Sequence, residues 1–301
     1  MNPKFKGLVF GIIAAIAYGT NPLFSLPLYA EGMTPDSVLL YRFGIGSLLL
    51  GVILLLKGES LKIQKKEILP LFILGVLFAL SSLLLFNSFL YMNAGIASTI
   101  LFVYPVLVAI IMAVFFKEKA SWLTYSCITL ALIGIALLYK GDGATSLNNT
   151  GMILVALSAL MYAVYIVAID YSAVSTMLSA KMTFWIILFG TSVFIASSGF
   201  MTELQPVPSA TFEWINILGV AIIPTIISIM FINISIKHIG ATYTAIIGAL
   251  EPVTALLIGI LVFHEAFTFR IAVGTLLIVV AVTLVVSEKS IIVGFKRRVT
   301  F

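Results

Sequence analysis

Few residues of this 301-residue chain could do chemistry, and the most notable one lies alone in an apolar run. Glu251 is about ten residues from either end of the run over residues 241–262. A carboxyl group at membrane depth costs roughly 2.5–3.5 kcal/mol and therefore usually faces a cavity or a partner. Glu251 could bind the amine of a substrate, take up and release a proton, or serve only as a hydrogen-bonded structural group.

Other polar side chains that could surround this carboxyl lie in other apolar runs. With Glu251 they form the predicted substrate-binding set: Tyr18, Asn21, Asn87, Tyr91, Tyr104 and Tyr162. Asn21 precedes Pro22, and a proline bends a helix and frees a backbone carbonyl. Such an interruption could lie beside a transport path or be a plain kink.

Arg42 is the other ionisable residue inside an apolar run. It could attract an anionic substrate, pair with Glu31 or Asp36 in the neighbouring loop, or extend its charge toward water. We favour the two structural interpretations over the anion site.

Several kinds of active site are missing from the sequence. One cysteine and two histidines are too few for a structural zinc site, and no Gly-rich phosphate loop with Lys and Ser or Thr is found. No nucleophile has an evident base. We therefore expect no catalytic residue, no metal, no cofactor and no enzymatic activity.

The composition points to lipid as the main solvent of the chain. Hydrophobic residues make up 61% and charged residues 10%, whereas a soluble domain carries about 25% charged residues. A spanning helix needs about 20 apolar residues. Ten windows meet this need: 8–29, 38–56, 69–92, 95–116, 121–139, 150–170, 179–200, 214–236, 241–262 and 268–287.

The basic residues predict the orientation of these helices. With ten spans, 14 of the 17 Lys and Arg residues lie on the side of the two termini, and Lys140 and Arg270 lie on the other. Cytoplasmic loops are the basic ones, so both termini are predicted to be cytoplasmic. The net charge of +5 then reflects orientation in the membrane, and no nucleic-acid partner is expected.

Paired residues indicate an internal repeat. The sequence Ile73-Leu74-Gly75-Val76 recurs 144 residues later. Further pairs recur at shifts of 144 to 147: Gly7 and Gly151, Tyr18 and Tyr162, Gly95 and Gly240, Pro105 and Pro252, Glu118 and Glu265. We predict five-helix repeats over residues 1–144 and 145–288, followed by a basic cytoplasmic tail over 289–301. Because five is odd, the second repeat must be inverted, as in secondary transporters.

The chain resembles the drug/metabolite transporter superfamily, and within it the ten-helix EamA-type transporters. The residues that carry this resemblance are Arg42 and the runs Tyr104-Pro105 to Lys117-Glu118 and Leu250-Glu251-Pro252 to His264-Glu265. The resemblance covers about residues 7–287. It implies an all-α fold around a central cavity in a plasma or inner membrane, with the fifth and tenth helices at the periphery.

The expected function is alternating-access transport of a small organic metabolite, such as an amino acid or an amphipathic compound. Export fits the resemblance better than uptake, and proton coupling through Glu251 is an open alternative. A lipid-modifying enzyme would need clustered acid and base residues, and a channel or scramblase would need a continuous polar stripe; neither is found.

Glu118 and Glu265 are expected to hydrogen-bond the start of the helix that follows each of them.

Overall fold

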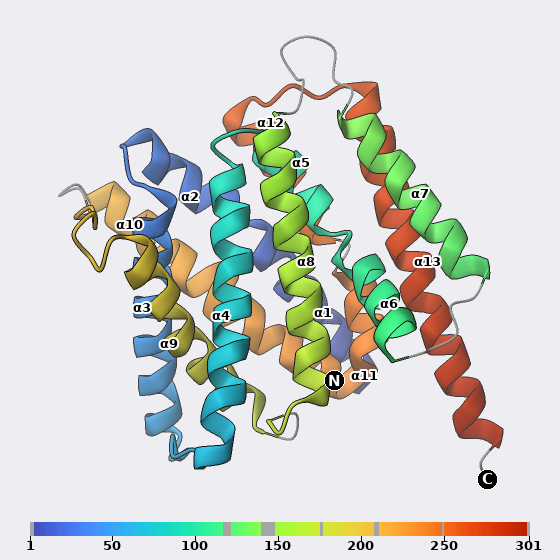
Figure 1. The fold of residues 1–301 in the computed structure, drawn as a ribbon, viewed down its shortest axis with the longest axis horizontal. Helices are drawn as coiled ribbons and strands as arrows, with labels where there is room; N and C mark the ends of the chain where they lie inside the picture. Colours follow the sequence, from blue (N-terminus) through green and yellow to red (C-terminus); the bar gives the residue numbers. More distant parts are fainter. Residues whose placement is uncertain are drawn as a thin grey trace.

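The chain is built from helices (Figure 1). The computed structural model describes residues 3–116, 122–139, 148–174, 177–207, 211–248 and 250–299, and these contain no strand. The helices are α1 (Pro3–Gly19), α2 (Asn21–Ala30), α3 (Pro35–Leu56), α4 (Lys65–Ser88), α5 (Ala94–Leu101), α6 (Tyr104–Phe115), α7 (Trp122–Tyr139), α8 (Asn149–Tyr171), α9 (Ser179–Ser197), α10 (Thr211–Ala221), the π-helix η2 (Ile222–Ile227), α11 (Ser228–Ile247), α12 (Leu250–Phe263) and α13 (Phe269–Val299).

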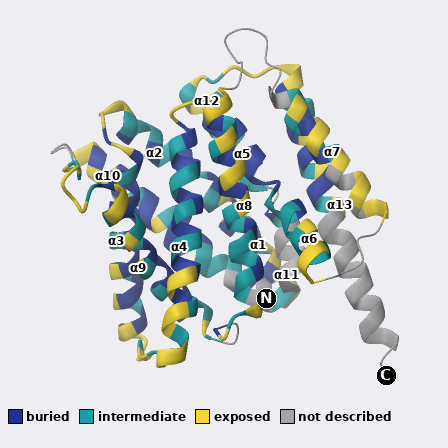
Figure 2. Cartoon of the chain, in the orientation of Figure 1, coloured by how far each residue is buried: buried dark blue, intermediate teal, exposed yellow. Residues whose placement is uncertain are grey.

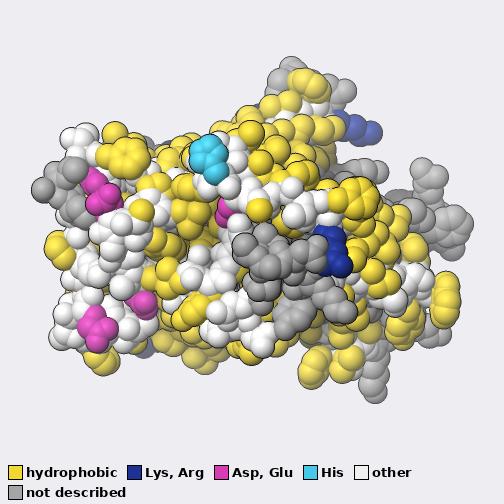
Figure 3. Space-filling view, turned by 90° about the horizontal axis from the view of Figure 1, so that it is seen from above, with side chains coloured by type: hydrophobic (Ala, Val, Ile, Leu, Met, Phe, Trp, Pro, Cys, Tyr) yellow, Lys and Arg dark blue, Asp and Glu magenta, His cyan; other side chains and the backbone are white. Residues whose placement is uncertain are grey.

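Seven helical segments in the described part are long and apolar enough to cross a membrane. Two shorter apolar helices, Leu250–Phe263 and Phe269–Leu284, accompany them. Large apolar side chains lie on the outside: Leu56, Trp122 and Phe269 are each more than 80% exposed, and Figures 2 and 3 show exposed and hydrophobic residues over much of the surface. The all-helical membrane protein is confirmed, while the count of ten spans stays a prediction.

Prolines divide three of the predicted spans. Pro22, Pro105 and Pro252 each lie in the first turn of a helix, α2, α6 and α12 respectively. A proline fits there because the first backbone N–H groups of a helix have no partner within it. The predicted spans 8–29 and 95–116 are therefore each broken, at Thr20 and at Phe102–Val103.

The same rule corrects the position of Glu251. We expected a loop near residues 237–240 and Glu251 at the centre of the next helix. Instead α11 continues to Ile247, and α12 begins at Leu250, so Glu251 is the second residue of its helix. The proline that follows it favours this start, because Pro252 in the interior of a helix would remove a backbone hydrogen bond, whereas in the first turn it removes none.

Packing of the helices places the breaks at the centre of the molecule. α1 packs on α11, α4 packs on both α8 and α9, and α5 packs on α12. α7 and α13 lie side by side at one edge of the bundle (Figure 1). The core therefore contains the broken helices, and the pair α7 and α13 is peripheral.

Arg42 lies in the core and not at the membrane surface. It is 1% exposed, its Nε donates to Thr225 Oγ1 at 2.8 Å, and its side chain hydrogen-bonds to Tyr18. The guanidinium carbon is 5.3 Å from the ring centre of Phe86. Within the described chain no carboxylate forms an ion pair with it, so pairing with the nearby loop and extension to water are both wrong for this structure.

Glu265 does not cap the helix that follows it. Its carboxylate accepts a hydrogen bond from the backbone N–H of Ala94, at the start of α5. The start of α13 uses Thr268 instead, whose hydroxyl accepts from the N–H of Ile271 at 3.3 Å. Threonine is a good N-cap residue, which explains why α13 does not need the glutamate. Glu118, the other predicted cap, lies outside the described residues.

Candidate functional site

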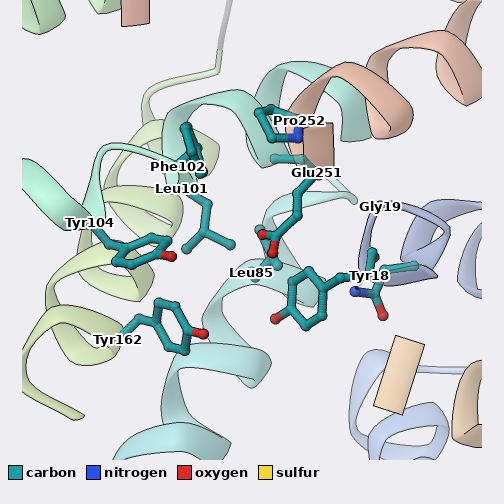
Figure 4. Close-up of a pocket in the computed structure, with 11 residues that line it drawn as sticks. Tyr18, Gly19, Leu85, Leu101, Phe102, Tyr104, Tyr162, Glu251 and Pro252 are labelled. Atoms are coloured by element: carbon teal, nitrogen blue, oxygen red, sulfur yellow. Dashed lines mark hydrogen bonds between the residues drawn. The ribbon is translucent and has the colours of Figure 1, made fainter. Parts of the chain in front are cut away.

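A central cavity lies where the three broken segments meet (Figure 4). Its volume in this conformation is about 20 Å³, which is room for about one water molecule. The lining residues come from α1, α2, α4, α5, α6, α8 and α12 and from the break after α5: Tyr18, Gly19, Asn21, Leu85, Ser98, Leu101, Phe102, Tyr104, Tyr162, Glu251 and Pro252. The cavity is therefore mainly apolar with a few polar groups, as small-molecule sites usually are.

The three residues that precede the prolines all line this cavity. Asn21, Tyr104 and Glu251 begin or nearly begin α2, α6 and α12. The first N–H groups of a helix are unpaired within it and carry a partial positive charge. Three helix starts thus meet at one space, in which Glu251 supplies a carboxyl group.

Tyrosine side chains form one wall of the cavity. The rings of Tyr104 and Tyr162 meet edge to face, 4.6 Å between centres, and Tyr165 stacks behind Tyr162 at 5.7 Å. In Figure 4 the hydroxyl groups of Tyr18, Tyr104 and Tyr162 point toward the same space as the carboxylate of Glu251. Such rings can contact the apolar part of a ligand, or a cation over their faces.

Asn21 offers an unused hydrogen-bond acceptor. Its Nδ2 donates to the carbonyl oxygen of Tyr18 at 2.9 Å. Its Oδ1 is buried and has no partner among the described residues, although the side chain is only 3% exposed. A buried acceptor without a partner costs free energy, and a ligand donor in the cavity would remove that cost.

The structure brings five of the seven predicted site residues together: Tyr18, Asn21, Tyr104, Tyr162 and Glu251. Asn87 and Tyr91 are not among the lining residues. Asn87 donates to the carbonyl of Leu83 at 2.8 Å, and Tyr91 lies in the turn after α4 with 44% of its surface exposed. A role in binding for these two residues stays a prediction.

The sequence analysis missed Ser98 as a lining residue. Ser98 belongs to α5, whose other residues are mostly buried and apolar. A single serine in a span is unremarkable, because its hydroxyl can bond to the preceding turn of its own helix. The signal that could have found it is its position six residues before Tyr104, on the other side of the helix break.

Comparison with known proteins identifies the family of the chain. The sequence profile described as "EamA-like transporter family" matches residues 5–140 and 149–287. The chain belongs to the EamA-like transporter family. It is thus a multi-pass membrane protein of a transporter family, and this argues against an enzyme.

Relatives of this EamA-like chain carry general names. "Uncharacterized transporter YxxF" of Bacillus subtilis (strain 168) is 25% identical over 85% of this chain and 81% of that protein. "Uncharacterized transporter YvbV" of the same strain is 25% identical over 94% of this chain and 92% of that protein. "Uncharacterized transporter YdfC", also from this strain, is 30% identical, but the match spans only 46% of this chain and 45% of that protein.

A solved structure supports the fold of this EamA-like chain. A chain described as "Crystal structure of protein" aligns with a TM-score of 0.68 and 18% identity. The alignment covers 92% of this chain and 95% of the other. At this identity the likeness concerns the fold alone.

Proposed function

We propose that this EamA-like protein is a secondary transporter that moves a small organic metabolite by alternating access. The observation that carries the proposal is the meeting of three helix breaks at one cavity that contains Glu251. Broken helices at a central site are typical of secondary transporters, because their ends present unpaired backbone groups to the substrate.

We propose further that residues 1–144 and 145–288 are inverted five-helix repeats. The contacts support this: α1 packs on α11 as α8 packs on α4. Ser228 donates to the carbonyl of Ala14 at 3.0 Å, and Ser81 donates to the carbonyl of Ser158 at 3.0 Å. Ala14 and Ser158 are 144 residues apart, the shift of the sequence repeat.

The lining residues favour a substrate that carries an amine and an apolar group. Glu251 and the free oxygen of Asn21 are acceptors, and the tyrosine rings provide apolar and cation-binding faces. None of the described lining residues carries a positive charge. An amino acid or an amphipathic amine fits these groups, and we propose export as the direction.

Reconstitution into liposomes with a panel of amino acids and amphipathic amines tests this function. A transporter gives saturable flux and countertransport, whereas unsaturable flux would support a channel and no flux across the panel would contradict the proposal. Imposed pH gradients test whether protons are coupled.

The role of Glu251 is tested by Glu251→Gln. The exchange keeps the size of the side chain and removes its charge, so we expect uptake to fall by at least about tenfold, as for loss of a hydrogen bond to a charged group. Glu59→Gln, in an exposed loop, is the matched control. Unchanged transport and unchanged proton dependence in Glu251→Gln would exclude the proposed role.

A further inference from the structure

A second glutamate joins two helices that approach the cavity from one end. The carboxylate of Glu265, in the loop between α12 and α13, accepts from the N–H of Ala94 at 3.0 Å. The N–H of Gly95 and the side chain of Asn93 also hydrogen-bond to it. We call this set of hydrogen bonds the Glu265–α5 contact. It satisfies backbone donors in the first turn of α5, which have no partner within the helix.

Helices α5 and α12 run between this contact and the cavity. α5 begins at Ala94 and reaches the cavity with Ser98 and Leu101, while α12 leaves the cavity at Glu251 and ends at Phe263. The two helices pack closely, because a Cβ atom added to Gly95 would lie 2.8 Å from the Cα of Leu256. The pair therefore closes the space between the cavity and the α12–α13 loop.

The loop is shaped to hold Glu265 in this place. His264 has a φ of +53°, a left-handed conformation that few residues other than glycine adopt. This reverses the chain, and the N–H of Glu265 donates back to the carbonyl of Gly259 at 2.9 Å. The Glu265 carboxyl group lies against Gly259, where a Cβ atom would overlap it. The left-handed backbone at His264 and the missing side chain at Gly259 thus both allow the Glu265 carboxyl group to lie in this place.

We propose that the Glu265–α5 contact holds α5 and α12 together as a gate, and that its release opens the cavity to the membrane face on which the α12–α13 loop lies. The proposal rests on the alternating-access function above. The hydrogen bonds of Glu265 involve no lining residue of the cavity, so it is a positioning residue for the gate and does not bind substrate.

The Glu265–α5 contact requires an acceptor oxygen at residue 265 and does not require a negative charge. Burial raises the pKa of Glu265 more than its hydrogen bonds lower it. A protonated carboxyl group, or the amide of glutamine, keeps an oxygen that can accept from Ala94. Glu265→Gln should therefore retain the hydrogen bond from Ala94, whereas Glu265→Ala should lose the whole contact.

Gly259→Ala gives a second way to break the contact without removing Glu265. The three atoms nearest to the added methyl group all belong to the Glu265 side chain, which would have to move. Alanine is also a better helix former than glycine, and this gain offsets part of the stability that the lost hydrogen bonds cost.

The test measures how fast a charged, membrane-impermeant thiol reagent labels a cysteine in the cavity. Ser98→Cys supplies this cysteine after the single native one is removed by Cys127→Ala. A separate chain with Phe267→Cys, an exposed position in the α12–α13 loop, identifies the membrane side on which the gate should open. Because no substrate is needed, the result can fail independently of the transport assay.

Labelling from that side should become about tenfold faster in Glu265→Ala and in Gly259→Ala, since hydrogen bonds to a carboxylate shift an opening equilibrium by about this factor. Glu265→Gln should stay within about twofold of the parent, as should Glu203→Ala, which changes an exposed carboxyl group elsewhere. Parent-like rates in both Glu265→Ala and Gly259→Ala, or faster labelling only from the opposite side, would overturn the proposal.

Discussion

Arg42 shows how a charge is accommodated inside this protein. Its guanidinium has lost nearly all contact with solvent, and the described residues offer it hydroxyl groups and aromatic rings in place of a carboxylate. Thr225 is central to this, because its hydroxyl accepts from Arg42 and donates to the carbonyl of Val220 at 2.9 Å. That carbonyl precedes the π-helix η2, where regular helix bonds are interrupted.

Thr225→Val should therefore destabilise the protein. The exchange keeps the shape but removes the acceptor of a buried guanidinium N–H, at a cost of about 1–3 kcal/mol. Thermal unfolding in detergent should show a lower midpoint for Thr225→Val, while Thr225→Ser, which keeps the hydroxyl group, should stay close to the original. Equal midpoints for the two variants would refute this account of Arg42.

Glu265 predicts a dependence of stability on pH. Because burial raises its pKa, the folded chain binds this proton more tightly than the unfolded chain. The bound proton therefore stabilises the folded protein. This stabilisation is complete below the ordinary carboxyl pKa of about 4.3, and it is lost as the pH rises through the raised pKa of Glu265 in the folded chain. Between pH 4 and pH 7, the unfolding midpoint of the original protein should fall more than that of Glu265→Gln, which cannot ionise. A larger fall of the unfolding midpoint for Glu265→Gln would contradict a raised pKa of Glu265 in the folded protein.

At the scale of helices, close packing depends on small residues. A Cβ atom on Gly75 of α4 would lie 2.8 Å from the carbonyl oxygen of Ile186 in α9, and one on Gly190 would lie 3.0 Å from the carbonyl oxygen of Gly75. Such contacts bring helix backbones together in membranes, where the hydrophobic effect does not drive association.

Gly75→Ala should separate α4 from α9 and cost about 1–3 kcal/mol, the usual cost of overpacking. Gly44→Ala is the matched control, since nothing lies within 4 Å of its added methyl group and alanine favours a helix. Thermal unfolding and the fraction of monodisperse protein measure both variants. If Gly44→Ala lost as much stability as Gly75→Ala, the close contact would not be the cause.

Hydrophobicity was enough to predict helices and membrane insertion, but it could not place their interruptions. Pro22, Pro105 and Pro252 lie inside predicted spans, whereas each lies in the first turn of a separate helix. This difference moves Glu251 from mid-helix to a helix start, and only the assembled bundle shows that three such starts share one cavity.

The predicted partners of Glu265 and Arg42 were both wrong, and for the same physical reason. Glu265 bonds α5, which precedes it by 171 residues, and Arg42 bonds Thr225, 183 residues away. Local sequence suggests local partners, so we expected the following helix for one and the adjacent loop for the other. Asn87 and Tyr91 illustrate the same limit, because spacing along the predicted span 69–92 does not tell which residues meet the cavity, and Tyr91 lies beyond the end of α4.

At the scale of the molecule, the core is mainly apolar with a few buried polar groups, and large apolar side chains also cover the outside, where a soluble domain would be polar. The cavity joins elements from both proposed repeats, with Tyr104 and Glu251 at equivalent helix starts. If two such halves exchange conformations, one carboxyl group and one tyrosine exchange environments as well. The asymmetry of these two residues is therefore the feature that can couple the motion to a charged substrate.

The topology needed for this exchange can be tested directly. With inverted five-helix halves, the loop at Glu59 lies on the cytoplasmic side and the loop at Phe267 on the opposite side. In a Cys127→Ala background, we expect Phe267→Cys to react with an impermeant thiol reagent in intact cells and Glu59→Cys to react only after permeabilisation. Both positions are exposed, so access is limited by the membrane alone. Reaction of both residues in intact cells would require an even number of spans between them in place of the proposed seven, and would contradict the inverted repeat.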